Sequence, residues 1–89
     1  MTEKMLDLQF SSQARDFLKK LDKSNWIRVV GKIEELKKNP FPHKVKRVED
    51  RKEKIFRIRI GDYRVLYIVF DEQCLLFVSK IEKRSRAYD

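Results

Sequence analysis

A β-hairpin is the strongest constraint that this sequence places on its fold. The stretch RIRIGDYRVLY, residues 57–67, has two runs of β-branched and aromatic residues on either side of Gly61-Asp62. A two-residue connection with glycine first favours a type II′ turn between antiparallel strands. Such a turn fixes the register and predicts that Arg59 lies opposite Arg64. The other predicted pairs are Ile60 with Tyr63, Ile58 with Val65, and Phe56 with Tyr67.

The register also assigns each hairpin residue to one face, because side chains alternate along a strand. The apolar face, which suits packing against helices, has Phe56, Ile58, Ile60, Tyr63, Val65, Tyr67 and Val69. The other face has Arg57, Arg59 and Arg64 near the turn, followed by Leu66, Ile68 and Phe70. We therefore expect Tyr63 and Tyr67 to be core residues.

The first half of the chain predicts a short strand and two helices. Residues 5–10 alternate as a strand, and a helix over 12–21 begins at a hydroxyl N-cap, Ser11 or Ser12. A second helix begins near Ser24 and ends at the NPFP sequence of residues 39–42. Its apolar stripe has Trp26, Val30, Ile33 and Leu36, with Ile27 and Val29 nearby. The two helices should form an antiparallel hairpin that packs on a sheet.

A last strand, CLLFVSKI at residues 74–81, follows a basic connection at residues 43–54 and the central hairpin. Together these segments predict a single α+β domain over residues 1–89, with the order β-α-α-β-β-β and a three-stranded antiparallel meander at its end. A three-residue loop at 71–73 would place Phe70 opposite Cys74 and Arg64 opposite Lys80.

That register predicts a row of three cations, Arg59, Arg64 and Lys80, across three strands, with no acidic residue on the same face. Like charges that lie opposite each other in a sheet are destabilising, by up to about 1 kcal/mol each. We therefore expect an anion to bind there.

The overall charge supports the same expectation. The 89 residues include 22 Lys and Arg against 14 Asp and Glu, a net charge of +8, which favours a polyanionic partner. A single cysteine excludes an internal disulfide, and there is neither an apolar run long enough for a membrane span nor a cluster of metal-ligating residues. We expect a cytoplasmic protein without a membrane partner or a metal site.

The stretches FRIRIGDYRVLYIVF and LFVSKIEKRSRAYD resemble the RelE branch of the RelE/ParE toxin family, and the resemblance extends over nearly the whole chain. The shared motifs are Y-R-x-x-Y at Tyr63, Arg64 and Tyr67, and K-R-x-R-x-Y at Lys83, Arg84, Arg86 and Tyr88. The resemblance implies a fold of the microbial ribonuclease type and the toxin of a type II toxin-antitoxin system. The implied activity is ribosome-dependent cleavage of mRNA in the A site, without metal or another cofactor. The implied partners are the ribosome, mRNA and a RelB-like antitoxin, with a heterotetramer as one arrangement of the complex.

The resemblance also implies which residues act. Arg64 and Arg84 match basic residues that stabilise the phosphate charge, and Tyr88 matches a tyrosine that orients substrate, stacks on a base or exchanges a proton. Arg57 and Arg59 match positions that are lysines in well-known members. A guanidinium stays protonated at ordinary pH, so Arg59 is better suited to holding phosphate than to acting as a base. The supporting RNA or ribosome contacts are Lys54, Lys80, Lys83 and Arg86.

Two questions stay open at this point. The first is the general base, for which Tyr88 is the leading candidate, while the single histidine, His43, is expected in a surface loop. The second is the activity itself, because a non-catalytic gyrase inhibitor of the ParE type, or a basic RNA-binding module, would share the scaffold. The KRSRAY ending and the paired arginines favour the cleaving branch.

Overall fold

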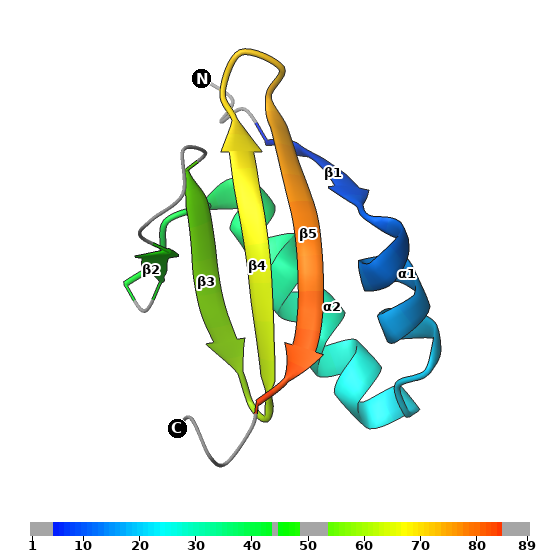
Figure 1. Ribbon diagram of the computed structural model, residues 1–89. Coiled ribbons are helices and arrows are strands. Elements are labelled where there is room, and N and C mark those ends of the chain that lie inside the picture. The colour runs from blue at the N-terminus through cyan, green and yellow to red at the C-terminus, as the bar shows by residue number, and fades with distance from the viewer. Residues whose placement is uncertain (1–4, 44, 49–53, 85–89) are drawn as a thin grey trace.

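A five-stranded sheet, with the second helix behind it and the first helix beside its β1 edge, forms the described part of the chain (Figure 1). This computed structural model describes residues 5–43, 45–48 and 54–84. The elements are β1 (Asp7–Phe10), α1 (Ser12–Lys19), α2 (Lys23–Lys38), β2 (Lys46–Val48), β3 (Ile55–Ile60), β4 (Tyr63–Phe70) and β5 (Leu75–Lys83). The sheet order is β1-β5-β4-β3-β2, antiparallel except for the parallel pair of β1 and β5. The predicted α+β fold is confirmed, and β2 is an addition to the predicted elements.

The two helices begin where side chains satisfy their first backbone N–H groups. Ser11 Oγ accepts a hydrogen bond from the backbone N–H of Ala14, as predicted for an N-cap at this position. α2 begins slightly earlier than predicted, because Asp22 rather than Ser24 is its N-cap and accepts from the backbone N–H of Asn25. The side-chain and backbone hydrogen bonds from Asn25 hold the pKa of Asp22 below its ordinary value. α2 ends at Lys38, directly before the NPFP sequence.

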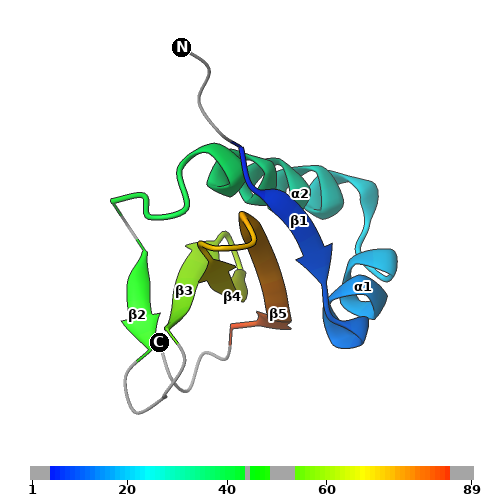
Figure 2. The same ribbon diagram turned by 90° about the horizontal axis from the view of Figure 1, so that it is seen from above.

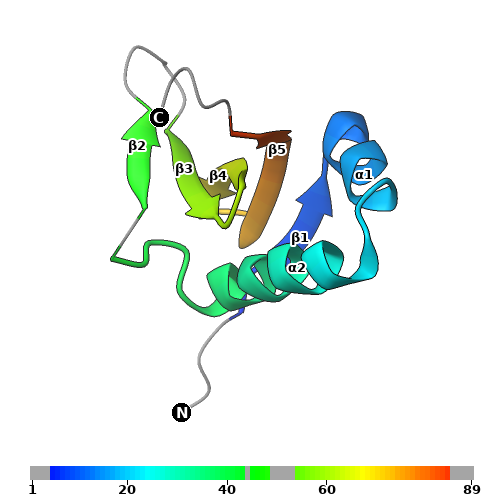
Figure 3. The same ribbon diagram turned by 90° about the horizontal axis from the view of Figure 1, so that it is seen from below.

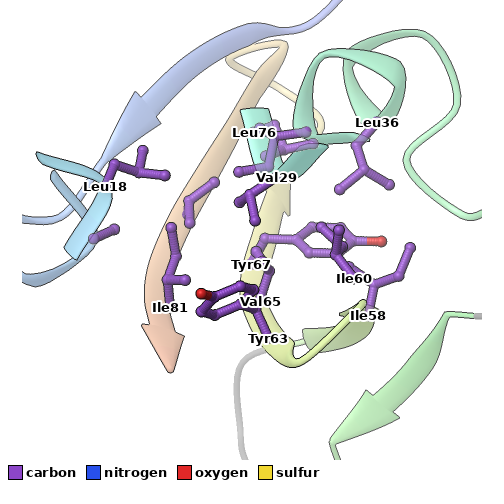
Figure 4. Close-up of a cluster of buried hydrophobic side chains, with 13 residues drawn as sticks. Leu18, Val29, Leu36, Ile58, Ile60, Tyr63, Val65, Tyr67, Leu76 and Ile81 are labelled. Carbon is purple, nitrogen blue, oxygen red and sulfur yellow. The ribbon is translucent and has the colours of Figure 1, made fainter. Parts of the chain in front are cut away.

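The core lies between the helices and the predicted apolar face of the hairpin (Figure 4). Its buried residues are Ala14, Leu18, Val29, Ile33, Leu36, Ile58, Ile60, Tyr63, Val65, Tyr67, Leu76, Val78 and Ile81. Phe56 and Val69 pack against this cluster while remaining partly exposed. The buried Tyr67 hydroxyl donates a hydrogen bond to the carbonyl oxygen of Pro40, and burial raises the pKa of Tyr67. Tyr63 and Tyr67 are therefore core residues, as predicted.

One part of the predicted helix stripe is wrong. Trp26 is 45% exposed and Ile27 is 53% exposed, whereas Val29, Ile33 and Leu36 are buried. In Figure 1, α2 passes behind the sheet at an angle, and its first turn lies beside β5 instead of behind the strands. This part of α2 therefore has no sheet surface to cover, and Trp26 and Ile27 stay exposed although they are apolar.

On the side of β5 that faces away from β4, the backbone is hydrogen-bonded partly by the backbone of β1 and partly by side chains. β1 pairs with β5 from Leu75 to Val78, and the chain then leaves the sheet to enter α1. Ser11 Oγ donates to the carbonyl oxygen of Ser79 at 2.7 Å. The side-chain amide of Gln13 donates to the Ile81 carbonyl at 2.8 Å and accepts from the Ile81 N–H at 3.0 Å. Side chains from the start of α1 thus hold the second half of β5 as a neighbouring strand would.

Candidate nucleic-acid interface

The central hairpin has the predicted register. Arg59 pairs with Arg64, and the other three predicted pairs are also present. Gly61 has a φ of +60°, and Asp62 is not among the described residues with positive φ, as a type II′ turn requires. The turn therefore places two arginines on adjacent strands, on the face that has no helix (Figure 2).

The predicted register between β4 and β5 is wrong. Phe70 pairs with Leu75, because the loop has four residues and ends at Cys74, which has a φ of +50°. A second shift lies between Leu66 and Tyr67, where Ser79 is an extra residue on β5. A bulge of this kind moves every later pair by one residue. After both shifts, the partner of Arg64 is Glu82 and not Lys80.

Glu82 contradicts the expectation that no acidic residue shares the arginine face. Its Oε2 lies 3.1 Å from Nη1 of Arg64, and its Oε1 lies 3.4 Å from Nζ of Lys80. The Arg64 side chain is 18% exposed and that of Glu82 is 32% exposed, so the pair is partly shielded yet open to solvent on one side. The carboxylate holds the Arg64 guanidinium in a defined place on the sheet.

A second row of side chains crosses four strands next to the first. In this row, Lys46 pairs with Arg57, Arg57 with Leu66, and Leu66 with Lys80. The sequence reasoning missed Lys46 because it lies in the basic connection, where β2 has only three residues and one apolar side chain. We call the two rows together the arginine face; it has Lys46, Arg57, Arg59, Arg64 and Lys80 as cations and Glu82 as its carboxylate.

Arg84 lies directly after β5 and joins the arginine face at the hairpin turn. Its backbone N–H donates to the Asp62 carbonyl at 2.7 Å, and its Nη1 donates to the Gly61 carbonyl at 3.4 Å. Arg28 reaches the same turn from α2, because its Nη1 lies 2.7 Å from the point where a Cβ on Gly61 would stand. The turn thus brings Arg84 next to the Arg59–Arg64 pair and adds Arg28, which the sequence reasoning did not single out.

Not every predicted contact lies on this face. Lys54 comes before the first residue of β3, at the end of the strand opposite to the turn. Lys83 pairs with the buried Tyr63, which places it on the helix side of the sheet. His43 is exposed in the segment between α2 and β2. Arg86 and Tyr88 lie outside the described residues.

The arginine face has the chemistry of a phosphate-binding surface. It has five cations and one carboxylate on a side of the sheet that neither helix covers (Figure 3). Guanidinium groups form paired hydrogen bonds with phosphate oxygens and stack on nucleobases, so three arginines on two adjacent strands suit a nucleic acid backbone.

Comparison with known proteins gives this surface a context. A family profile described as the ParE toxin of the type II toxin-antitoxin system parDE matches residues 8–88. The RelE1 protein of Methanocaldococcus jannaschii, which is named as a toxin, is 38% identical over 74 residues, or 80% of this chain and 81% of that protein. The chain belongs to the RelE/ParE toxin family.

Solved structures of RelE toxins share the fold of this family member. The archaeal RelE–RelB complex from Pyrococcus horikoshii has a RelE chain with a TM-score of 0.80 and 26% identity, covering 92% of this chain and 98% of that one. The RelBE2 complex from Mycobacterium tuberculosis gives a TM-score of 0.77 and 26% identity, covering 93% and 95%. The intact RelBE complex of Escherichia coli, at 24% identity and a TM-score of 0.78, shows the same fold.

The RelE/ParE family profile includes both rows of the arginine face and the ending that follows β5. Arg84, Arg86 and Tyr88 all lie within the matched residues. In this RelE-like toxin, none of the helices formed by the described residues has the length and apolar character needed to cross a membrane.

Proposed function

We propose that this type II toxin is a ribosome-dependent endoribonuclease that cleaves mRNA in the ribosomal A site in the cytoplasm, and thereby inhibits translation. The main support for the proposal is the strand pair in which Arg59 lies opposite Arg64, with the Arg84 side chain hydrogen-bonded to the adjacent turn. Three guanidinium groups around one short turn can surround a single phosphate.

The proposed reaction depends mainly on positively charged groups close to the scissile phosphate. The ribose 2′-hydroxyl attacks the adjacent phosphorus, the 5′-oxygen leaves, and the products are a 2′,3′-cyclic phosphate and a 5′-hydroxyl. Negative charge accumulates on the phosphorus oxygens in the transition state, and fixed cations stabilise that charge. This chemistry requires no metal ion, and the arginine face supplies the charge through side chains.

The roles follow from position. Arg64 and Arg84 stabilise the phosphate charge, and Arg57 and Arg59 hold the RNA backbone as phosphate clamps. Lys80 supports them from β5, next to Glu82. Tyr88 follows Arg84 closely in the chain and is the proposed residue for orienting or stacking on the substrate. Lys54, Lys83 and Arg86 are proposed as contacts with the ribosome and its RNA.

An antitoxin is the second proposed partner. The structural relatives include RelE chains solved with RelB, which favours a RelB-like antitoxin for this chain as well. A net charge of +8 would attract an acidic segment to the arginine face and so block RNA. A heterotetramer of two toxins and two antitoxins is one proposed arrangement.

Expression of the toxin in a bacterial host tests the proposal. Induction should arrest growth and produce cleaved mRNA that sediments with ribosomes, whereas Arg64→Ala or Arg84→Ala should abolish both effects in a folded protein. Arg47→Ala is the matched control, because Arg47 pairs with Phe56 and lies on the helix side of the sheet. Undiminished toxicity of the Arg64→Ala, Arg84→Ala double variant would contradict the proposal. Intact mRNA with accumulated DNA–gyrase complexes would support gyrase inhibition instead.

A further inference from the structure

We propose that Glu82 is the general base of the cleavage reaction, the group that takes the proton from the attacking 2′-hydroxyl; this inference rests on the proposed function. Among the described residues, Glu82 is the carboxylate of the arginine face, between Arg64 of β4 and Lys80 of β5. The base is the part of the chemistry that the arginines themselves cannot perform, because guanidinium groups stay protonated.

The fold presents this carboxylate to the RNA side of the sheet. Ile81 is completely buried on the helix side, and its backbone is held at both polar atoms by the Gln13 amide. Because side chains alternate along a strand, Lys80 and Glu82 must project from the opposite face. The two-step register shift that begins at Cys74 and ends at Ser79 then places Glu82, and no other β5 residue, opposite Arg64.

The carboxylate has the capacity to accept another hydrogen bond. An ionised carboxylate offers about four acceptor positions, and the ion pairs with Arg64 and Lys80 are one contact to each oxygen. The side chain is also 32% exposed, so a ribose hydroxyl can reach it. A phosphate bound by Arg64 would bring the neighbouring 2′-hydroxyl close to a carboxylate that lies 3.1 Å from the same guanidinium.

The proposed step conserves atoms and charge. A carboxylate oxygen of Glu82 takes the 2′-hydroxyl proton as the bond between O2′ and phosphorus forms. The bond between phosphorus and O5′ breaks, and the leaving O5′ takes a proton from water. The protonated Glu82 then gives its proton to the hydroxide that remains. The net result is transesterification without a consumed acid or base.

The charged groups that face Glu82 explain why an anion can work here. Arg64 faces it from β4 and Lys80 from its own strand, while Arg59 lies one strand further along the same row. These cations offset the repulsion between the carboxylate and the RNA phosphate. They also hold the carboxylate in place, which a general base needs for proton transfer.

Glu82 could instead act only by positioning Arg64, and Glu82→Gln separates the two roles. The glutamine keeps an acceptor oxygen for the Arg64 guanidinium but is a negligible base. A positioning role would therefore tolerate the change, while a proton-accepting role would not. Glu82→Asp is the second variant, since it keeps the carboxylate on a shorter side chain.

Single-turnover cleavage by the purified toxin on ribosomes programmed with mRNA, measured across pH, provides the test. Glu82→Gln should slow cleavage by about 100-fold or more and remove the acid limb of the pH–rate profile. Glu82→Asp should retain part of the rate together with the acid limb. The control is Glu72→Gln, an exposed carboxyl change in the loop between β4 and β5, which should cleave at the wild-type rate.

Three results would overturn the inference. A cleavage rate of the Glu82→Gln toxin within about threefold of the wild-type rate would exclude a role as the base. A slower Glu82→Gln with an unchanged pH profile assigns Glu82 to positioning. If the wild-type toxin does not cleave mRNA on ribosomes, the proposed function fails as well, so the wild-type reaction distinguishes the two failures.

Discussion

Arg64 on β4 and Glu82 on β5 lie opposite each other in the sheet and form an ion pair of 3.1 Å. The pair joins the two strands at the point where the arginine face is most crowded with cations. It also defines how Arg64 presents its guanidinium group to a ligand. The chemistry proposed for this toxin therefore depends on a contact between strands that are not joined by the hairpin turn.

Arg64 should be sensitive to geometry as well as to charge. Replacing it with alanine is expected to lower single-turnover mRNA cleavage by about 100- to 1,000-fold, as for the loss of one transition-state donor. Arg64→Lys keeps the charge but loses the planar fork, so its rate should lie between those of alanine and wild type. Circular dichroism should show an unchanged fold. Equal rates for the lysine and alanine variants would indicate that charge at this position contributes nothing.

Lys46 should contribute to RNA affinity by an electrostatic contact with a phosphate, which weakens as the salt concentration rises. Lys46→Ala is expected to weaken binding to single-stranded RNA and to reduce the slope of log affinity against log salt by about 0.7, the value for one lost phosphate contact. Fluorescence anisotropy over a salt series measures both quantities. Arg47→Ala, whose pairing with Phe56 directs it to the other face, is the control. Equal slopes for the two variants would place RNA elsewhere on the surface.

Gly61 should be required for stability of the hairpin. Its φ of +60° is unfavourable for residues with a side chain, and a Cβ there would stand 2.7 Å from Nη1 of Arg28. Gly61→Ala is therefore expected to lower the free energy of unfolding by about 1–3 kcal/mol in urea titrations. Adding Arg28→Ala should recover the part of this stability loss that comes from the contact with Arg28. The part that comes from the backbone conformation of residue 61 should remain. A Gly61→Ala protein as stable as wild type would exclude the turn conformation described above.

Tyr67 should stabilise the fold without taking part in catalysis. Tyr67→Phe removes the hydrogen bond to the Pro40 carbonyl and is expected to lower the free energy of unfolding by about 1 kcal/mol, with mRNA cleavage unchanged. Loss of cleavage in a folded Tyr67→Phe protein would instead place this hydroxyl in the active site.

The same hydroxyl predicts a pH dependence. Burial raises the pKa of Tyr67, so the folded state keeps its proton at a pH where the unfolded chain has lost it. The stability that this group provides is complete below about pH 10, the ordinary tyrosine value, and decreases as the pH rises further. Urea titrations at pH 9 and pH 11 should show a smaller decrease for Tyr67→Phe than for wild type. An identical decrease in both proteins would contradict the assignment.

The hairpin could be predicted from sequence because its determinants are local. Gly61 and Asp62 specify the turn, and the turn specifies both the Arg59–Arg64 pair and the buried face. β4 is apolar at every position from Val65 to Phe70, so the faces follow from the turn register and not from an apolar pattern in that strand. The contact of Arg84 with this turn is not specified by any local pattern and comes from the structure.

The third strand could not be predicted in the same way, because its register depends on contacts distant in sequence. Cys74 adds a residue to the loop, and Ser79 adds another where Ser11 binds its carbonyl oxygen. No local pattern marks either shift, yet together they replace Lys80 by Glu82 as the partner of Arg64. Edge strands are similarly difficult to predict, and Lys46 was missed because β2 is short and mostly polar.

The most direct test of the proposed activity is to incubate the purified toxin with ribosomes that carry a defined mRNA and to map the new RNA ends. We predict cleavage at the codon in the A site, with a 2′,3′-cyclic phosphate on one product and a 5′-hydroxyl on the other. A metal chelator should not lower the cleavage rate under conditions in which the ribosomes stay intact. The Arg64→Ala toxin should leave nearly all of the mRNA intact over the time in which the wild-type toxin cleaves it. Intact mRNA with the wild-type toxin, or cleavage by the Arg64→Ala toxin at the wild-type rate, would contradict the proposal that the arginine face is a ribonuclease site.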